Sequence, residues 1–352
     1  MKGGRKMRRY LNAIFGNRDI CRSLGESIEK NALSHALLIE GDKGSGKRTL
    51  AKEIAKALLC EERENKSTPL PCCACRACYL VDHALAADLH YISRGERATL
   101  GVDAVRDMIE DTTMSSTEFD RKIYIFEDAH TMTAGAQNAL LKIMEEPPEG
   151  VVLILLTESA DSMLTTVRSR ARLIRMQRFT PEEITEYLKT DAEELIRPYA
   201  SRTEELEALL LLAGGSIGEA KRLLTPESAT LARRERAEIF AILEALSEKS
   251  YASLSASLAA LPQKREEMKA SLLLLHRALR DLILLKRAEA PPLTFFSSKD
   301  EIKDPVAALR IGMLFAFTDA VEGALTELER NAGIGSTVTM LAAKLRNAQK
   351  ER

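Results

Sequence analysis

The sequence predicts an α/β domain built on a parallel five-stranded sheet, followed by a wholly helical region. Three observations carry this prediction. Between about residues 32 and 176, short runs rich in Ile, Val and Leu alternate with longer stretches of helical periodicity, which is typical of βαβ units. The first of these runs leads into a glycine-rich loop and then a helix. Beyond Arg178 the β-branched runs disappear and helical periodicity remains.

Five strands are expected, at residues 36–40, 88–92, 122–127, 151–157 and 172–176. A helix should begin at Thr180-Pro181-Glu182-Glu183, because threonine suits an N-cap, proline the first turn and acids the positive end of the helix dipole. Turn and capping residues at 224–228 predict a second junction, and residues 290–300 predict a loop within the last helical part.

Composition limits the classes of function. The 51 Lys and Arg residues are balanced by 52 Asp and Glu residues, so net charge would not draw the whole chain onto nucleic acid. The apolar runs are far shorter than the roughly 20 residues that a membrane-spanning helix needs. No signal-peptide pattern follows the basic N-terminus. We therefore expect a cytoplasmic protein with no membrane partner, whose DNA contacts are local or shared with partner proteins.

The loop after the first predicted strand has the form of a P-loop, with a strand before it and a helix after it. Its glycines let backbone N–H groups surround phosphate oxygens, and its lysine can reach the outer phosphates. Arg48 stands where such loops place the Ser or Thr that binds magnesium, and Thr49 is one residue too late. We expect ATP binding without efficient hydrolysis; a glycine-rich turn that binds no nucleotide is the alternative. The candidate residues are Gly41, Gly44, Ser45, Gly46, Lys47, Arg48 and Thr49.

Five of the six cysteines lie between Cys60 and Cys78. In a chain that is not expected to be exported, this clustering favours a metal site over disulfides. Cys60, Cys72, Cys75 and Cys78 give two Cys-x-x-Cys steps and one distant thiolate, which suits a tetrahedral zinc site. Zinc held by four cysteines would stabilise a loop rather than catalyse. Cys73 could compete as a ligand, and a redox pair of Cys72 and Cys75 is the alternative.

The predicted strand at 122–127 ends in Glu127 and Asp128, the form of an element that positions magnesium and the attacking water. Residues 138–148 then read Asn-Ala-Leu-Leu-Lys-Ile-Met-Glu-Glu-Pro-Pro. In these residues the chain resembles the bacterial clamp-loader family of AAA+ proteins, whose ATPase subunits carry Asp-Glu-x-His and a closely similar second run. The acid order is reversed here, as in many delta-prime subunits of that family. The reversal moves each carboxylate by roughly 1 Å, enough to cost about 100-fold in rate.

The resemblance implies roles for further residues. Thr157 matches a sensor hydroxyl near the γ-phosphate, and Arg170 matches an arginine finger that enters the ATP site of the adjacent subunit. The alternative for Arg170 is an ordinary surface arginine. Gly218 stands where the family has a nucleotide-sensing arginine. Since the trans-acting arginine is kept while three catalytic positions are altered, the pattern indicates a subunit that completes a neighbour's site. The four cysteines also match the family's zinc module.

The resemblance covers residues 10–225 well and implies three domains. These are an AAA+ domain with a zinc module at 1–177, a three-helix lid at 178–226 and an all-α collar at 227–352 that holds five subunits in a ring. The implied function is that of a delta-prime subunit of the DNA polymerase III clamp loader, with no polymerase active site of its own. The implied partners are the gamma/tau and delta subunits, the sliding clamp and, through the complex, primer-template DNA.

Two other interpretations remain open. A gamma/tau-type ATPase motor subunit is favoured by the intact Lys47 and opposed by Arg48, the reversed acids and Gly218. A free-standing P-loop switch with a zinc-dependent nucleic-acid module belongs to a different class. The near-neutral charge and the lack of aromatic stacking residues argue against it.

Overall fold

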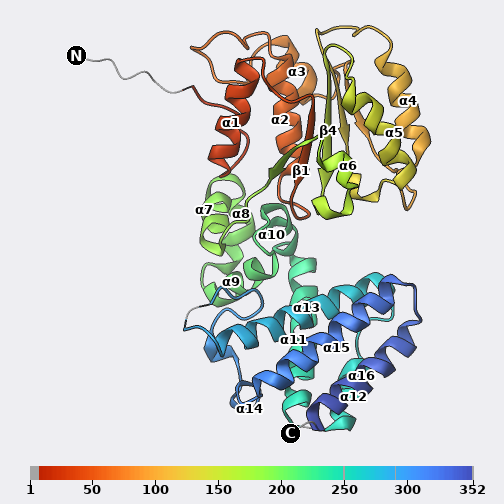
Figure 1. The fold of residues 1–352 in the computed structure, drawn as a ribbon. Coiled ribbons are helices and arrows are strands. Elements are labelled where there is room, and N and C mark those ends of the chain that lie inside the picture. The colour runs from red at the N-terminus through yellow and green to blue at the C-terminus, as the bar shows by residue number, and fades with distance from the viewer. Residues whose placement is uncertain (1–7, 249, 290, 351–352) are drawn as a thin grey trace. The chain divides into compact units, whose positions relative to one another are not determined.

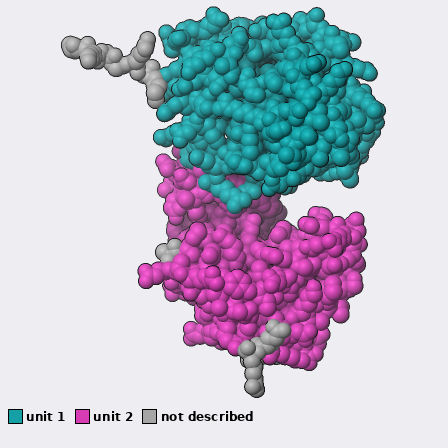
Figure 2. All heavy atoms as spheres, in the orientation of Figure 1, with its two compact units in different colours: residues 1–178 teal, residues 179–352 magenta. Residues whose placement is uncertain are grey.

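The computed structural model describes residues 8–248, 250–289 and 291–350. The chain divides into two compact units, with the boundary between Arg178 and Phe179 (Figure 2). Residues 1–7 of the predicted first domain and residues 351–352 of the predicted third domain lie outside the described residues. The further boundary at residue 226, between a lid and a collar, stays a prediction.

The first unit contains the predicted parallel sheet of five strands (Figure 1). Their order across the sheet is β2-β3-β4-β1-β5, so β1 pairs with β4 on one side and β5 on the other. Three strands are one residue shorter than predicted, because the ladder pairing stops while single backbone hydrogen bonds continue at the ends. The strands are β1 (Ala36–Glu40), β2 (Leu89–Ile92), β3 (Lys122–Phe126), β4 (Val151–Thr157) and β5 (Arg172–Arg175).

Helices cover both faces of the sheet, since successive strand residues point to opposite sides. Leu37 and Ile39 of β1 share a core with the helices of one face, α1 (Arg18–Glu29), α2 (Lys47–Leu59) and α3 (Arg76–Asp82). Leu38 shares a core with those of the other face, α4 (Val102–Thr112), α5 (Ala134–Glu145) and α6 (Thr165–Arg168) (Figure 1). The unit also has two 3-10 turns, η1 (Ala129–Thr131) and η2 (Ala160–Ser162).

In the described residues of the second unit, all of the regular secondary structure is helical, as the sequence predicts. Thr180 caps α7 in the predicted way: its hydroxyl accepts from the Glu183 backbone, and the Glu183 carboxylate accepts from the Thr180 backbone. The helices are α7 (Pro181–Asp191), α8 (Glu193–Ile196), α9 (Thr203–Leu212), α10 (Ile217–Leu223), α11 (Pro226–Glu248), α12 (Tyr251–Ala259), α13 (Arg265–Leu285), α14 (Asp304–Ala307), α15 (Ile311–Glu329) and α16 (Ile334–Lys350), with 3-10 turns η3 (Arg197–Tyr199) and η4 (Lys299–Glu301).

The loop predicted at 290–300 is confirmed from residue 291 to 298; residue 290 lies outside the described residues. The fully buried Asp281 of α13 holds this loop, because its carboxylate accepts from the backbone N–H groups of Thr294, Phe295 and Phe296. Among the described helices, none is both long and apolar enough to cross a membrane.

Candidate nucleotide and zinc sites

The glycine-rich loop joins β1, which lies between β4 and β5 in the sheet, to α2. Gly46 is the N-cap of α2 with a φ of 93°, a left-handed conformation that favours glycine. A Cβ on Gly41 would lie 2.6 Å from the Ser45 hydroxyl and 2.9 Å from Cβ of Met176, so only glycine fits there without movement. The loop is therefore compact, and it leads into the first turn of α2, where backbone N–H groups have no partner within a helix.

Lys47, the first residue of α2, reaches back across the loop. Its Nζ donates to the carbonyl oxygens of Gly41 at 2.6 Å and Asp42 at 2.9 Å. Burial lowers the pKa of Lys47, against the opposite effect of the charges on Glu158, Asp42 and Asp128. The Ser45 hydroxyl is buried and has no hydrogen-bond partner among the described residues. Phosphates would be held by the Lys47 ammonium group, the N–H groups of the first turn of α2 and the Ser45 hydroxyl.

The magnesium position of such a loop is altered in its contacts as well as in its sequence. Nε of Arg48 lies 2.9 Å from Oε1 of Glu127, the residue that follows β3. The Arg48 guanidinium also lies 5.3 Å from the ring centre of Tyr91 on β2. No N–H of the described residues is aligned for a hydrogen bond to this Glu127 oxygen, so the contact is an ion pair only. Arg48 is thus paired with Glu127, one of the two acids that the sequence assigns to a metal site.

The other predicted residues of this site have local contacts. Asp128 adopts a left-handed conformation with a φ of 51°, and its carboxylate lies 4.0 Å from Nε of Arg94. Thr157 is fully buried; its hydroxyl donates to the Ser159 carbonyl at 2.7 Å, and its own carbonyl accepts from the N–H of Gly41. Thr157 therefore anchors the start of the loop while its hydroxyl is engaged elsewhere. Thr49 is exposed on α2.

Arg170 follows α6 and is held by a different helix. Its Nη2 lies 2.6 Å from Oε1 of Glu145 at the end of α5, and its Nη1 donates to the Thr166 carbonyl at 3.1 Å. The neighbouring Arg168 pairs instead with Asp161. Arg170 is partly exposed, with 36% of its side chain accessible. Gly218 lies in the second unit, as the second residue of α10.

Three residues that contact the site were not predicted from the sequence. They are Tyr91 beside Arg48, Arg94 beside Asp128, and Glu145 beside Arg170. A signal for the first two was present. Tyr91 is the last residue but one of the predicted strand at 88–92, and Arg94 closely follows that strand. The carboxyl ends of parallel strands meet at one edge of a sheet. Glu145 belongs to the Glu-Glu-Pro-Pro run, but its pairing with Arg170 depends on how α5 and α6 pack.

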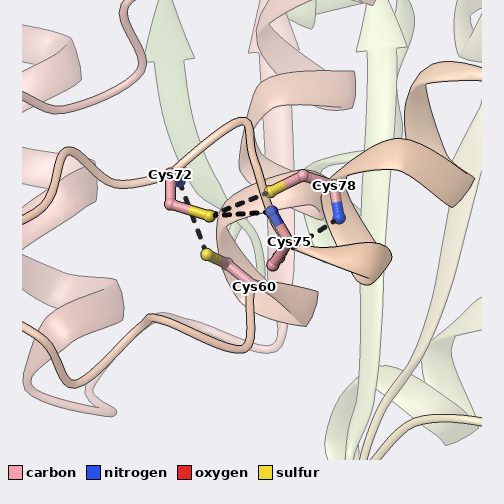
Figure 3. Close-up of side chains that lie close together, drawn as sticks. All are labelled: Cys60, Cys72, Cys75 and Cys78. Carbon is pink, nitrogen blue, oxygen red and sulfur yellow. Dashed lines mark hydrogen bonds between the residues drawn. The ribbon is translucent and has the colours of Figure 1, made fainter.

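The four predicted zinc ligands come together between α2 and α3 (Figure 3). The sulfur atoms of Cys60, Cys72, Cys75 and Cys78 all lie within 4.8 Å of one another. Cys73 lies outside this group; it is exposed, and its thiol is directed to the Pro71 carbonyl at 3.7 Å. The structure thus separates Cys73 from the candidate ligands, a question that the sequence left open.

Backbone N–H groups surround the sulfur atoms of this cluster. Cys72 N–H donates to Cys60 Sγ at 3.5 Å, Cys75 N–H to Cys72 Sγ at 3.3 Å and Cys78 N–H to Cys75 Sγ at 3.5 Å. A hydrogen bond from Cys78 lowers the pKa of Cys60 to about 5, while the same contact raises the pKa of Cys78. Since N–H donors stabilise thiolates, the set fits a tetrahedral metal ion of the zinc type.

Comparison with known proteins relates the first unit to one family. Residues 16–180 match the family described as "DNA polymerase III, delta subunit". The chain is 33% identical over 183 residues to DNA polymerase III subunit delta' of Bacillus subtilis, covering 52% of this chain and 53% of that protein. It is 31% identical over 216 residues to DNA polymerase III subunit gamma of Buchnera aphidicola, covering 61% and 58%. The chain thus spans little more than half the length of either relative.

One solved structure, a gamma subunit-related protein of Thermotoga maritima, aligns with 94% of this chain and 99% of its own at 20% identity. Its TM-score is 0.39, which is too low to support a structural argument.

Proposed function

Because this chain belongs with the AAA+ clamp-loader subunits of DNA polymerase III, we propose that it acts as a delta-prime-type subunit. In this role it completes the ATP site of a neighbouring subunit and hydrolyses little or no ATP itself. The observation that carries the proposal is the ion pair between Arg48 and Glu127, 2.9 Å apart, at the place where a working site holds magnesium.

The chemistry of hydrolysis explains why this pair matters. Magnesium in such a site is bound by a loop hydroxyl, an acidic side chain and phosphate oxygens. Arginine offers donors only, so Arg48 cannot replace the hydroxyl as a ligand. Its positive charge is also paired with the Glu127 carboxylate and would repel a divalent cation. Asp128 lies 4.0 Å from Nε of Arg94 and is shorter than the glutamate that the family's ATPases place there. Neither acid is therefore placed for its usual task.

Arg170 is the residue that would act on the neighbour. An arginine finger supplies positive charge to the transition state of phosphoryl transfer, worth about 10³ to 10⁵ in rate. The Glu145 carboxylate holds the Arg170 guanidinium at the end of α5, and the side chain remains partly exposed. A partner's phosphate could replace this carboxylate, because exposed ion pairs contribute only about 0–1 kcal/mol.

The four-cysteine cluster would hold one zinc ion as a structural element. It joins the end of α2, the P-loop helix, to the start of α3. We include in the proposal the partners that the clamp-loader resemblance implies: the gamma/tau and delta subunits, with the sliding clamp and primer-template DNA reached through the assembled ring. The lid and collar roles of the helices after residue 178 belong to the same proposal.

A second candidate is a gamma/tau-type motor subunit. It is favoured by the intact Lys47, which keeps the position of a nucleotide-binding lysine, and by the gamma relative of 31% identity. The two candidates differ in one property, namely ATP turnover by this chain alone.

The experiment for Arg170 uses a ring reconstituted with the cognate partner subunits. We expect Arg170→Ala to lower the DNA-stimulated ATPase rate by about 10³-fold per affected site while the ring still assembles. Arg168→Ala is the matched control, because Arg168 lies two residues away, forms its own ion pair with Asp161 and has 35% of its side chain exposed, against 36% for Arg170. An unchanged rate in Arg170→Ala, or an equal fall in both variants, would contradict the finger role.

A further inference from the structure

The second residue of α2 carries a fixed positive charge directly at the phosphate loop. Arg48 Nε lies 2.9 Å from Glu127 Oε1, and the guanidinium lies over the ring of Tyr91. Arg48 is 71% exposed, whereas Glu127 is only 21% exposed. An exposed cation is thus paired with Glu127, the first of the two acids assigned to a metal site.

We propose that this P-loop binds a nucleoside di- or triphosphate without a divalent metal ion, with the guanidinium of Arg48 supplying the charge that magnesium supplies in other P-loops. The inference deepens the proposed function, since it rests on the expectation that the loop binds nucleotide. It goes further because it assigns the metal-free nucleotide as the ligand and Arg48 as the residue that favours this form.

The first argument concerns what magnesium would meet here. Magnesium demands near-octahedral coordination by oxygen atoms at about 2.0–2.1 Å. The guanidinium of Arg48 offers donors and no acceptor atom, so it cannot be a ligand of the ion. With Arg48 in place, an incoming cation would have to displace a guanidinium from Glu127 and then remain beside it. Binding of magnesium therefore costs electrostatic energy at this site.

The second argument concerns the phosphates. A guanidinium presents its donors in a fork that fits phosphate oxygens, and it is more weakly hydrated than an ammonium group. With Nε directed to Glu127, Arg48 still has donors on its two Nη atoms. Lys47, one residue earlier, provides a second cation, and the buried Ser45 hydroxyl has no partner among the described residues. The loop can thus balance phosphate charge from its own residues.

The third argument is that Arg48 can turn toward a phosphate at little cost in free energy. The contact between Arg48 and Glu127 lacks an aligned N–H at Oε1, and the arginine is largely exposed. Such a pair is weak, so the guanidinium can turn its Nη atoms toward a phosphate while Nε stays near Glu127.

The test is calorimetric titration of the full chain with ATP and with ADP, with excess magnesium or in buffer freed of divalent ions by a chelating resin. A resin is used because a soluble chelator would compete for zinc at the cysteines. We expect the wild-type dissociation constants in the two buffers to agree within about threefold. Arg48→Thr, which restores a hydroxyl, should bind at least about tenfold more weakly without magnesium than with it.

The matched control is Arg175→Thr. Arg175 ends β5, is 72% exposed and lies 2.8 Å from Glu40, which is 21% exposed. The same substitution there removes an ion pair of similar exposure, in this case also a hydrogen bond, outside the loop. Arg175→Thr should behave as the wild type.

Three results would overturn the inference. One is wild-type binding that weakens about tenfold or more when magnesium is removed. Another is Arg48→Thr binding that stays independent of magnesium. The last is a wild type that binds neither nucleotide in either buffer. That last result would leave the role of Arg170 intact, because the ring assay measures hydrolysis in the neighbouring site; a failed Arg170 assay would likewise leave the titrations interpretable.

Discussion

Replacing Asp88 with asparagine should destabilise the first unit through one buried carboxylate. Asp88 precedes β2 and is fully buried. Its Oδ1 accepts from the N–H of Thr117 at 2.8 Å, and its Oδ2 accepts from those of Glu118 at 2.8 Å and Phe119 at 2.9 Å. It therefore fastens the segment between α4 and β3, the strand that leads to Glu127.

The magnitude follows from these three bonds. A hydrogen bond to a charged group contributes roughly 1.5–3 kcal/mol, and a buried donor left without a partner costs about 1–3 kcal/mol. Asparagine keeps one oxygen but turns an NH₂ group toward at least one of the donors. We expect a loss of about 3–6 kcal/mol, which lowers the melting temperature of a unit of this size by roughly 10–20 °C.

The loss should depend on pH. Burial raises the pKa of Asp88, but the three backbone N–H groups and Lys122 outweigh it and hold that pKa below its usual value. A lowered pKa in the folded state stabilises the protein above the unfolded pKa of about 3.9, and this stability disappears as the pH falls through the lower folded value. The difference between wild type and Asp88→Asn should thus be full at neutral pH and shrink below about pH 4.

The assay is scanning calorimetry of the full chain, with Asp107→Asn as control because Asp107 is exposed on α4. The control should change the melting temperature of the first unit little. If Asp88→Asn melted within about 2 °C of the control at neutral pH, the carboxylate would contribute under about 1 kcal/mol and the reasoning would be refuted.

Two other outcomes are expected. Metal analysis should find about one zinc per wild-type chain. Cys78→Ser should lose this zinc, and Cys73→Ser should keep it. A folded wild-type protein without metal would refute the zinc site. Arg170→Ala should change the free energy of unfolding by at most about 1 kcal/mol, because its pair with Glu145 is exposed; a larger loss, measured by denaturant titration, would indicate a structural role for this arginine.

The sheet could be predicted because its strands carry strong local signals. The runs at 36–40 and 151–157 are continuous, apolar and bounded by turns, and β1 and β4 have these bounds. The start of α7 was equally predictable, since Thr180 and Glu183 form their capping box within four residues. The P-loop residues were identifiable because the loop and its helix are contiguous in sequence.

Contacts between distant segments could not be predicted. Arg48 was recognised as an altered residue, but its pairing with Glu127 depends on how α2 lies across the end of β3. The place of Thr157 near a γ-phosphate stays a prediction, and the bond from its hydroxyl to the Ser159 carbonyl belongs to a turn that the sequence did not reveal. The position of Cys73 outside the cysteine cluster likewise depends on the backbone, which has a φ of 57° at that residue.

The measurement that tests the central claim most directly is steady-state ATP hydrolysis by the isolated chain, with Lys47→Ala as the background. The ion pair between Arg48 and Glu127 predicts that the wild type turns over no more ATP than Lys47→Ala does. Turnover in the wild type that Lys47→Ala abolishes would contradict the account and would make this chain a motor subunit.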